Sequence, residues 1–219
     1  MAGAMDLVPP AKVAEDTLYR IGLQPNPLVW PPRSRIGGGR YDDPERQFRT
    51  LYIAEQRRAS FVEILAPFRR SAVLFHRPSP NGHSDWPADK FARLVRWCGR
   101  RCMGQLQLAP GQRWLDLRLA GVRKGVHAEL AGLLEELGLE GLEITGSQIR
   151  HRRLTQCIAR WAHDQGFAGI AYKSRFGDHF DCWAVFEGAR FEPIGRPEPI
   201  LPHDPDLRET VQLLGLSLI

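Results

Sequence analysis

Three polar side chains, Arg40, Tyr52 and Glu63, follow one another early in the chain, in the stretch GGGRYDDPERQFRTLYIAEQRRASFVEILAP. Arg40 comes directly after three glycines, which let a backbone approach a ligand closely, and its planar guanidinium suits phosphate or carboxylate. Glu63 stands among apolar neighbours in ASFVEIL, where burying a carboxylate is costly unless it is paired or hydrogen-bonded. The chemistry these residues suggest is recognition of an anionic group beside a carboxylate.

Each of these residues also has an ordinary structural explanation. Arg40 fits a surface turn, Tyr52 fits a core tyrosine with a satisfied hydroxyl, and Glu63 fits the exposed face of an amphipathic helix. Ser174 and Arg175, in YKSRFGD, end a predicted strand where ligands often bind, and the serine can instead cap a loop. Taken singly, the residues leave the function open.

Several common sites are missing from the sequence. It has no G-x-x-x-x-G-K-[ST], no HExxH and no GxSxG, and GGGRYD does not match the dinucleotide-binding pattern. Cys98 and Cys102 lie four residues apart, as on one helix face, with His76 and His83 upstream, but a zinc site needs tighter ligand pairs. We interpret the cysteines as buried or free thiols in a reducing cytoplasm and expect no metal.

The composition limits the class of protein. A chain of 219 residues with 43% apolar content is expected to form one domain with its own core. It has no apolar run long enough to span a membrane and no recognisable secretory signal, so we expect a cytoplasmic protein without membrane contact. The net charge of +5 suits an anionic partner, but the basic residues are scattered and direct nucleic-acid binding is not expected.

The elements that must position the polar residues are a mixture of strands and helices, predicted from the spacing of apolar residues and from Gly and Pro. The predicted strands span 18–21, 49–55, 104–109, 113–119, 142–145, 168–176, 181–188 and 190–195, the last two as a terminal pair. The predicted helices span 11–17, 56–66, 88–102, 125–139, 151–166 and 204–218. Gly138 and Gly166 are expected as C-caps, and Asp204 or Asp206 as an N-cap. These elements predict a single mixed α/β domain.

The ordered set of motifs resembles the RES domain family, named for its Arg, Glu and Ser motif residues. The matching pieces, from about Thr17 to Glu187, are LYRIG, GGRYDDP, LYIAE, ASFVEIL, LTQCIARWAHDQGFAGIAYKSRF and CWAVFE. With this resemblance the chain divides into an N-terminal extension (1–16), a RES domain (17–195) and a C-terminal Pro-rich segment with a helix on the same domain (196–219).

The resemblance implies a fold and an activity. The fold is α+β, a single domain with a bent, split mixed β-sheet flanked by helices, similar to ADP-ribosyltransferase toxins. The activity is consumption of NAD by cleavage of the nicotinamide–ribose bond, as NAD phosphorylase or glycohydrolase, in the toxin of a toxin–antitoxin pair. The alternatives are a mono-ADP-ribosyltransferase acting on a protein or small molecule, and a silent module that binds NAD or ADP-ribose.

The resemblance also implies ligands and partners. NAD would be the substrate, water or inorganic phosphate the acceptor, and no cofactor is expected. A cognate antitoxin is the expected protein partner, and a homodimer is left open. The sequence departs from the family where it has YDDP instead of the WN of many members, and where the stretch Arg70–Gly111 looks longer than in compact toxins.

Family motif residues carry over to five positions. Glu63, Arg40 and Tyr52 would be catalytic, with Glu63 stabilising an oxocarbenium-like ribose. Arg20 and Arg40 would hold the pyrophosphate through charge-assisted hydrogen bonds. Tyr52 would stack on nicotinamide or hydrogen-bond the substrate, and Ser174 would bind a ribose hydroxyl, a phosphate oxygen or the nucleophile.

Overall fold

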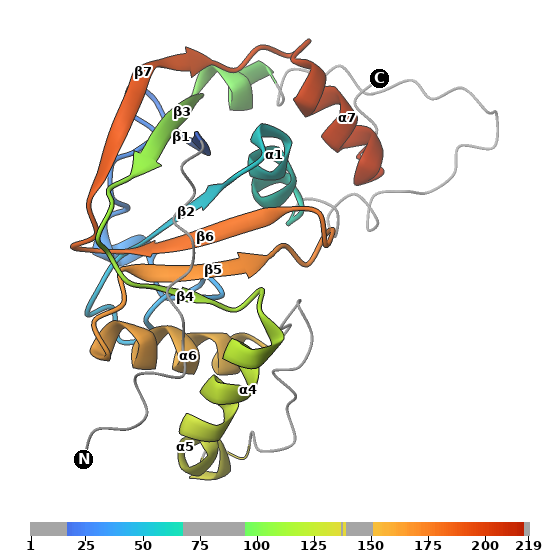
Figure 1. Cartoon of the computed structure of the whole chain (residues 1–219). Helices are drawn as coiled ribbons and strands as arrows, with labels where there is room; N and C mark the ends of the chain where they lie inside the picture. The colour runs from blue at the N-terminus through green and yellow to red at the C-terminus, as the bar shows by residue number, and fades with distance from the viewer. Residues whose placement is uncertain (1–16, 68–94, 137, 139–150, 217–219) are drawn as a thin grey trace, which may run out of the picture.

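A seven-stranded sheet runs through the computed structural model, which describes residues 17–67, 95–136, 138 and 151–216 (Figure 1). Its strand order is β4-β5-β6-β2-β1-β3-β7. The strands are β1 (Leu18–Leu23), β2 (Thr50–Ala54), β3 (Arg101–Leu108), β4 (Trp114–Asp116), β5 (Gly169–Lys173), β6 (Asp181–Phe186) and β7 (Phe191–Pro199). Neighbouring strands are antiparallel except β4 and β5, which are parallel, so the sheet is mixed.

The sheet is split between β1 and β2. These two strands share a single paired position, Tyr19 opposite Ala54, whereas β1 pairs along its whole length with β3 and β2 along its whole length with β6. Figure 1 shows β3 and β7 turned steeply away from the layer that β2, β6 and β5 form. This architecture confirms the predicted mixed α/β fold with a bent, split sheet.

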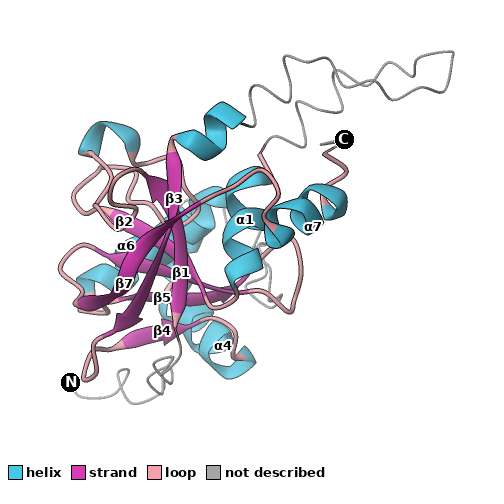
Figure 2. Cartoon of the chain, turned by 90° about the horizontal axis from the view of Figure 1, so that it is seen from above, coloured by secondary structure: helices cyan, strands magenta, loops and turns pink. Residues whose placement is uncertain are grey.

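The helices cover the sheet in two groups. They are α1 (Arg57–Leu65), α4 (Ala120–Glu129), α5 (Ala131–Glu136), α6 (Arg152–Asp164) and α7 (Pro205–Leu213), with a short 3-10 turn, η2, at Arg33–Arg35. Figures 1 and 2 show α1 and α7 side by side, while Figure 1 shows α4, α5 and α6 together beyond β4 and β5. In the described residues, no helix combines the length and the apolar content needed to cross a membrane.

Three apolar clusters hold these layers together. The largest joins α1, α4, α5 and α6 to β5 and β6, with Ile158 and Ile170 fully buried in it. The second fills the bend of the sheet, where the rings of Trp114 and Trp183 meet edge to face at 5.3 Å. The third lies under α1 and α7 and includes Phe61. Helix α1 therefore contributes to two clusters and is fixed from both sides.

Two predictions of local structure are wrong. The predicted helix at 88–102 ends too late, because Cys102 belongs to β3, where it pairs with Gly22, and so does not share a helix face with Cys98. The predicted terminal pair of strands does not form, because β6 pairs with β2 and β5, while β7 pairs with β3. Strand β7 also continues through the Pro-rich segment to Pro199, which an edge strand tolerates.

The predicted helix ends are mostly confirmed. The Asp204 carboxylate caps α7 by accepting hydrogen bonds from the backbone N–H groups of Asp206 and Leu207. Gly138 and Gly166 have φ of +64° and +75°, the left-handed conformation of a C-cap. Helix α4 begins at Ala120, earlier than predicted. Of the predicted helix at 11–17, only residue 17 is described and it is not helical, and the predicted strand at 142–145 lies outside the described residues.

The four cysteines are free thiols. Cys98, Cys102 and Cys182 are buried and Cys157 is half-buried. Cys182 lies on β6 directly opposite Tyr172 of β5, on the sheet face that packs against α1 and α6. This face carries most of the polar residues described next.

Candidate active site

Glu63 and Ser174 meet where β5 ends beside α1. The Ser174 hydroxyl donates to Oε1 of Glu63 at 2.5 Å, the length of a hydrogen bond to a charged acceptor. The same hydroxyl accepts a hydrogen bond from the backbone N–H of Phe176 at 3.1 Å, and Ser174 has no exposed surface. Glu63 is half-buried on α1, next to the fully buried Val62. The carboxylate is therefore held in one orientation by a serine 111 residues away.

Arg40 lies close to this pair. Its guanidinium carbon is 5.2 Å from the ring centre of Tyr172 and 5.4 Å from that of Tyr41, within cation–π range of both. Burial acts to lower the pKa of Arg40, but the electrostatic effects of Tyr41, Tyr172 and Glu63 leave the pKa above its ordinary value. Tyr172 precedes Ser174 by two residues, as expected for neighbours on one face of an extended chain. The structure thus brings Glu63, Ser174 and Arg40 to one place.

The Tyr52 hydroxyl contacts the loop that carries Arg40. The hydroxyl donates to Oδ1 of Asp42 at 2.8 Å and accepts from the backbone N–H of Tyr41 at 2.9 Å. Burial, together with the Asp42 carboxylate, raises the pKa of Tyr52 well above its usual range, so the phenol stays protonated. Its contacts therefore support the Arg40 loop.

Arg20 lies at the split in the sheet. From β1, its Nε donates to the carbonyl of Pro27 and its Nη1 to the carbonyl of Tyr52 on β2, both at 2.8 Å. Burial lowers the pKa of Arg20 to about 10, so the side chain is still a cation at neutral pH. Arg20 thus bridges two strands that share one paired position.

Sequence reasoning missed three residues of this neighbourhood. Tyr172 could have been found from its i−2 spacing to Ser174 in a strand. From the sequence, Asp42 was notable only as part of YDDP, which departs from the family pattern. In the structure it accepts hydrogen bonds from the backbone of the glycine loop. Gln156 gave no local signal, because its contacts to that loop span more than a hundred residues.

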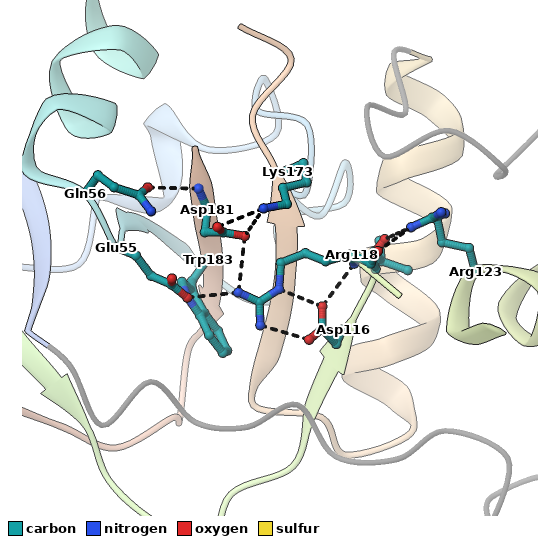
Figure 3. A network of polar contacts seen from close by, with 9 residues as sticks. Glu55, Gln56, Asp116, Arg118, Arg123, Lys173, Asp181 and Trp183 are labelled. Atoms are coloured by element: carbon teal, nitrogen blue, oxygen red, sulfur yellow. Dashed lines mark hydrogen bonds and ion pairs between the residues drawn. The ribbon is translucent and has the colours of Figure 1, made fainter. Parts of the chain in front are cut away.

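A network of ion pairs ties together the ends of four strands, one of which leads to Ser174 (Figure 3). Arg118 binds both carboxylate oxygens of Asp116 at 2.8 Å, Glu55 at 2.9 Å and Asp181 at 3.3 Å. Lys173 adds a contact of 2.8 Å to Asp181. These residues lie at or just beyond the ends of β2, β4, β5 and β6. The network therefore fixes the strand that leads directly into Ser174.

The fold and this arrangement define a mixed α/β protein with a carboxylate, a hydroxyl and a guanidinium gathered where the end of β5 meets the C-terminal half of α1. The family model of the RES domain matches residues 17–208, and the chain belongs to the RES domain family. No curated protein matches the sequence.

The chain is similar in fold to a solved structure, the crystal structure of the M. tuberculosis MbcT–MbcA toxin–antitoxin complex. The similarity has a TM-score of 0.54 and 15% sequence identity, and it covers 91% of this chain and 89% of the other. At this identity the likeness concerns the fold. The family predicted from the ordered motifs is confirmed.

Proposed function

We propose that this protein consumes NAD by cleaving its nicotinamide–ribose bond, and that it is the toxin of a toxin–antitoxin pair. Membership of the RES domain family and the toxin–antitoxin complex of similar fold support the proposal. The observation that carries it is the Glu63 carboxylate, held by Ser174 beside the Arg40 cation. That arrangement pairs a fixed negative charge with a group that binds anions.

The chemistry suits these two charges. As the bond between C1′ of the ribose and the nicotinamide nitrogen breaks, its electron pair leaves with nicotinamide, which departs neutral without needing a proton. Positive charge develops on the ribose, and the fixed carboxylate of Glu63 would stabilise it. Water then bonds to C1′ and releases a proton to solvent, giving ADP-ribose, or an oxygen of inorganic phosphate bonds there instead, giving the 1-phosphate of the same ribose. Arg40 would bind the anionic part of the substrate.

Incubation of the purified protein with NAD, with and without phosphate, tests the reaction directly. We expect release of nicotinamide, and the second product distinguishes hydrolysis from phosphorolysis. The isosteric change Glu63→Gln removes the negative charge and is expected to lower turnover by about 100-fold or more. Glu129→Gln, at an exposed position of α4, is the matched control and keeps full activity.

Absence of nicotinamide release under both conditions would contradict the proposed reaction. The toxin role is tested separately by expression in bacteria, where growth arrest should depend on Glu63. Arrest that persists with Glu63→Gln would show that any toxicity has another source. Labelling of lysate proteins from labelled NAD would instead point to ADP-ribosyl transfer.

A further inference from the structure

We propose that Asp42 and Gln156 are positioning residues that hold the glycine loop in the one conformation that places Arg40 beside Glu63. The activity measured to test this rests on the proposed function, but the geometry stands without it. The loop contains three consecutive glycines, Gly37 to Gly39, and such a segment is flexible unless other groups fix it.

Asp42 binds the N–H side of the loop. Its Oδ2 accepts hydrogen bonds from the backbone N–H groups of Gly37 at 2.9 Å and Gly39 at 2.7 Å, and its Oδ1 accepts from the Tyr52 hydroxyl at 2.8 Å. The Asp42 residue is only 5% exposed. Backbone N–H groups curled around a carboxylate form an anion-binding nest. The glycine amides therefore bind the protein's own carboxylate.

Gln156 binds the C=O side of the same two glycines. From α6, its Nε2 donates to the carbonyls of Gly37 and Gly39, each at 3.0 Å, and the residue is 7% exposed. Asp42 and Gln156 thus satisfy both polar groups of the two glycines on either side of Gly38. Together they form a clamp that fixes the backbone immediately before Arg40.

The requirement for glycine at position 39 follows from the same packing. A Cβ atom there would lie 2.7 Å from Oδ1 of Asp42, closer than real side chains approach. The backbone of the loop can therefore contact the Asp42 carboxylate this closely only if residue 39 is a glycine.

Helix α6 holds the remainder of the loop through two further residues on the same face. Arg160 forms an ion pair of 3.0 Å with the fully buried Asp43, and the ring of His163 stacks on Phe48 at 4.1 Å. Gln156, Arg160 and His163 have the i, i+4, i+7 spacing of one helix face. The face as a whole serves as a rigid support for the segment 37–48.

The test uses the full chain and the change Gln156→Leu, which removes both donors at similar volume. Misplacement of Arg40 is expected to lower kcat/KM for NAD by about 10- to 100-fold. Gln165→Leu, at an exposed position after the end of α6, is the control and leaves kcat/KM unchanged. Gln156→Leu should lower the thermal unfolding midpoint, because two carbonyls lose their donor, but the variant should remain folded at the assay temperature. Gln165→Leu should keep its midpoint.

A double-mutant cycle separates positioning from a direct role. If Gln156 acts through Arg40, Gln156→Leu causes no further loss of kcat/KM, or of NAD affinity by calorimetry, once Arg40→Ala is present. An equal loss in both backgrounds would overturn the proposal. Asp42→Asn should behave in the same way, because its amide N–H₂ would face the N–H groups of the two glycines.

A second readout needs no turnover and so separates failure of the clamp from failure of the proposed function. Because the Arg40 guanidinium lies over two aromatic rings, its side-chain N–H resonance is expected to be shifted by their ring currents. The resonance is assigned by its disappearance in Arg40→Lys. In Gln156→Leu it should move to the position of an exposed arginine. An unchanged resonance there would overturn the proposal, whatever the activity assay shows.

Discussion

Ser174 shows how a motif residue can act through another residue. It has no exposed surface, and its hydroxyl both donates to Glu63 and accepts from the backbone of Phe176. A hydroxyl used in both directions is satisfied without a ligand. Among the roles expected from the sequence, none included holding the carboxylate in place, which is what these contacts do in the structure.

Arg20 leads to a prediction about stability. Replacing Arg20 by alanine leaves the carbonyls of Pro27 and Tyr52 without their donors and weakens the link between β1 and β2. We expect the free energy of unfolding to fall by about 2–4 kcal/mol, measured by urea denaturation. Arg196→Ala, on the exposed strand β7, is the control and should change it by less than about 0.5 kcal/mol.

The opposite result has a clear meaning. If Arg20→Ala keeps the unfolding free energy and only weakens NAD binding, the side chain serves the pyrophosphate, as the motif suggested. A combined loss would show that one arginine does both.

At the scale of residues, the motif order indicated which residues matter but not what they contact. Arg40, Glu63 and Ser174 do gather in the structure. The support from Gln156 could not be predicted, because Gln156 reaches the glycine loop across 117 and 119 residues of sequence. Such a contact depends on where α6 packs, which no local pattern records.

At the scale of elements, α7 braces the helix that carries Glu63. Arg57 of α1 forms ion pairs of 2.6 Å with both Asp204 and Asp206, at the start of α7. Burial acts to raise the pKa of Asp204, but the hydrogen bonds from Arg57 and from the backbone N–H of Leu207 outweigh it and lower the pKa. The ionised carboxylate is therefore favoured in the folded state.

This lowered pKa predicts how stability depends on pH. The contribution of Asp204 is fully present above its unfolded pKa, about 4, and is lost as the pH falls through the lower folded value. Asp204→Asn should therefore lower the free energy of unfolding at neutral pH by about 1–3 kcal/mol. It should also make the loss of stability at acid pH less steep. Thermal unfolding measured from neutral pH to below pH 3 checks this. A variant with the same acid dependence as the unchanged chain would contradict it.

The predicted elements agree with the structure where the residues that determine them are close in sequence. They disagree where a strand pairs with a partner far away in sequence. Gly166 and Asp204 mark helix ends through their own backbone and side-chain chemistry. Strands β6 and β7 are adjacent in sequence, which favoured a hairpin, yet β6 is enclosed by β2 and β5. Cys102 was assigned to a helix by its spacing, but pairing with β1 across the sheet places it in a strand.

At the scale of the molecule, the split sheet has two unequal halves. Strand β6 is paired on both sides and largely buried, whereas β7, among the strands that the structure describes, pairs with β3 alone and is exposed from 192 to 199. Local opening of an exposed edge costs less free energy than opening of a central strand. We expect the amide protons of β7 to exchange with solvent faster than those of β6. Equal protection of the two strands in native-state hydrogen exchange would contradict this.

The buried thiols give the folded protein an internal reporter. Burial, with the charge of Glu63 second, raises the pKa of Cys182 well above its ordinary range, and burial also raises the pKa values of Cys98, Cys102 and Cys157. The thiolate is the form that alkylating reagents attack, so it is scarce in the native state. The rate at which such a reagent modifies Cys182 therefore reports how often the core around this thiol opens. The measurement needs no added label, because the thiol is the protein's own.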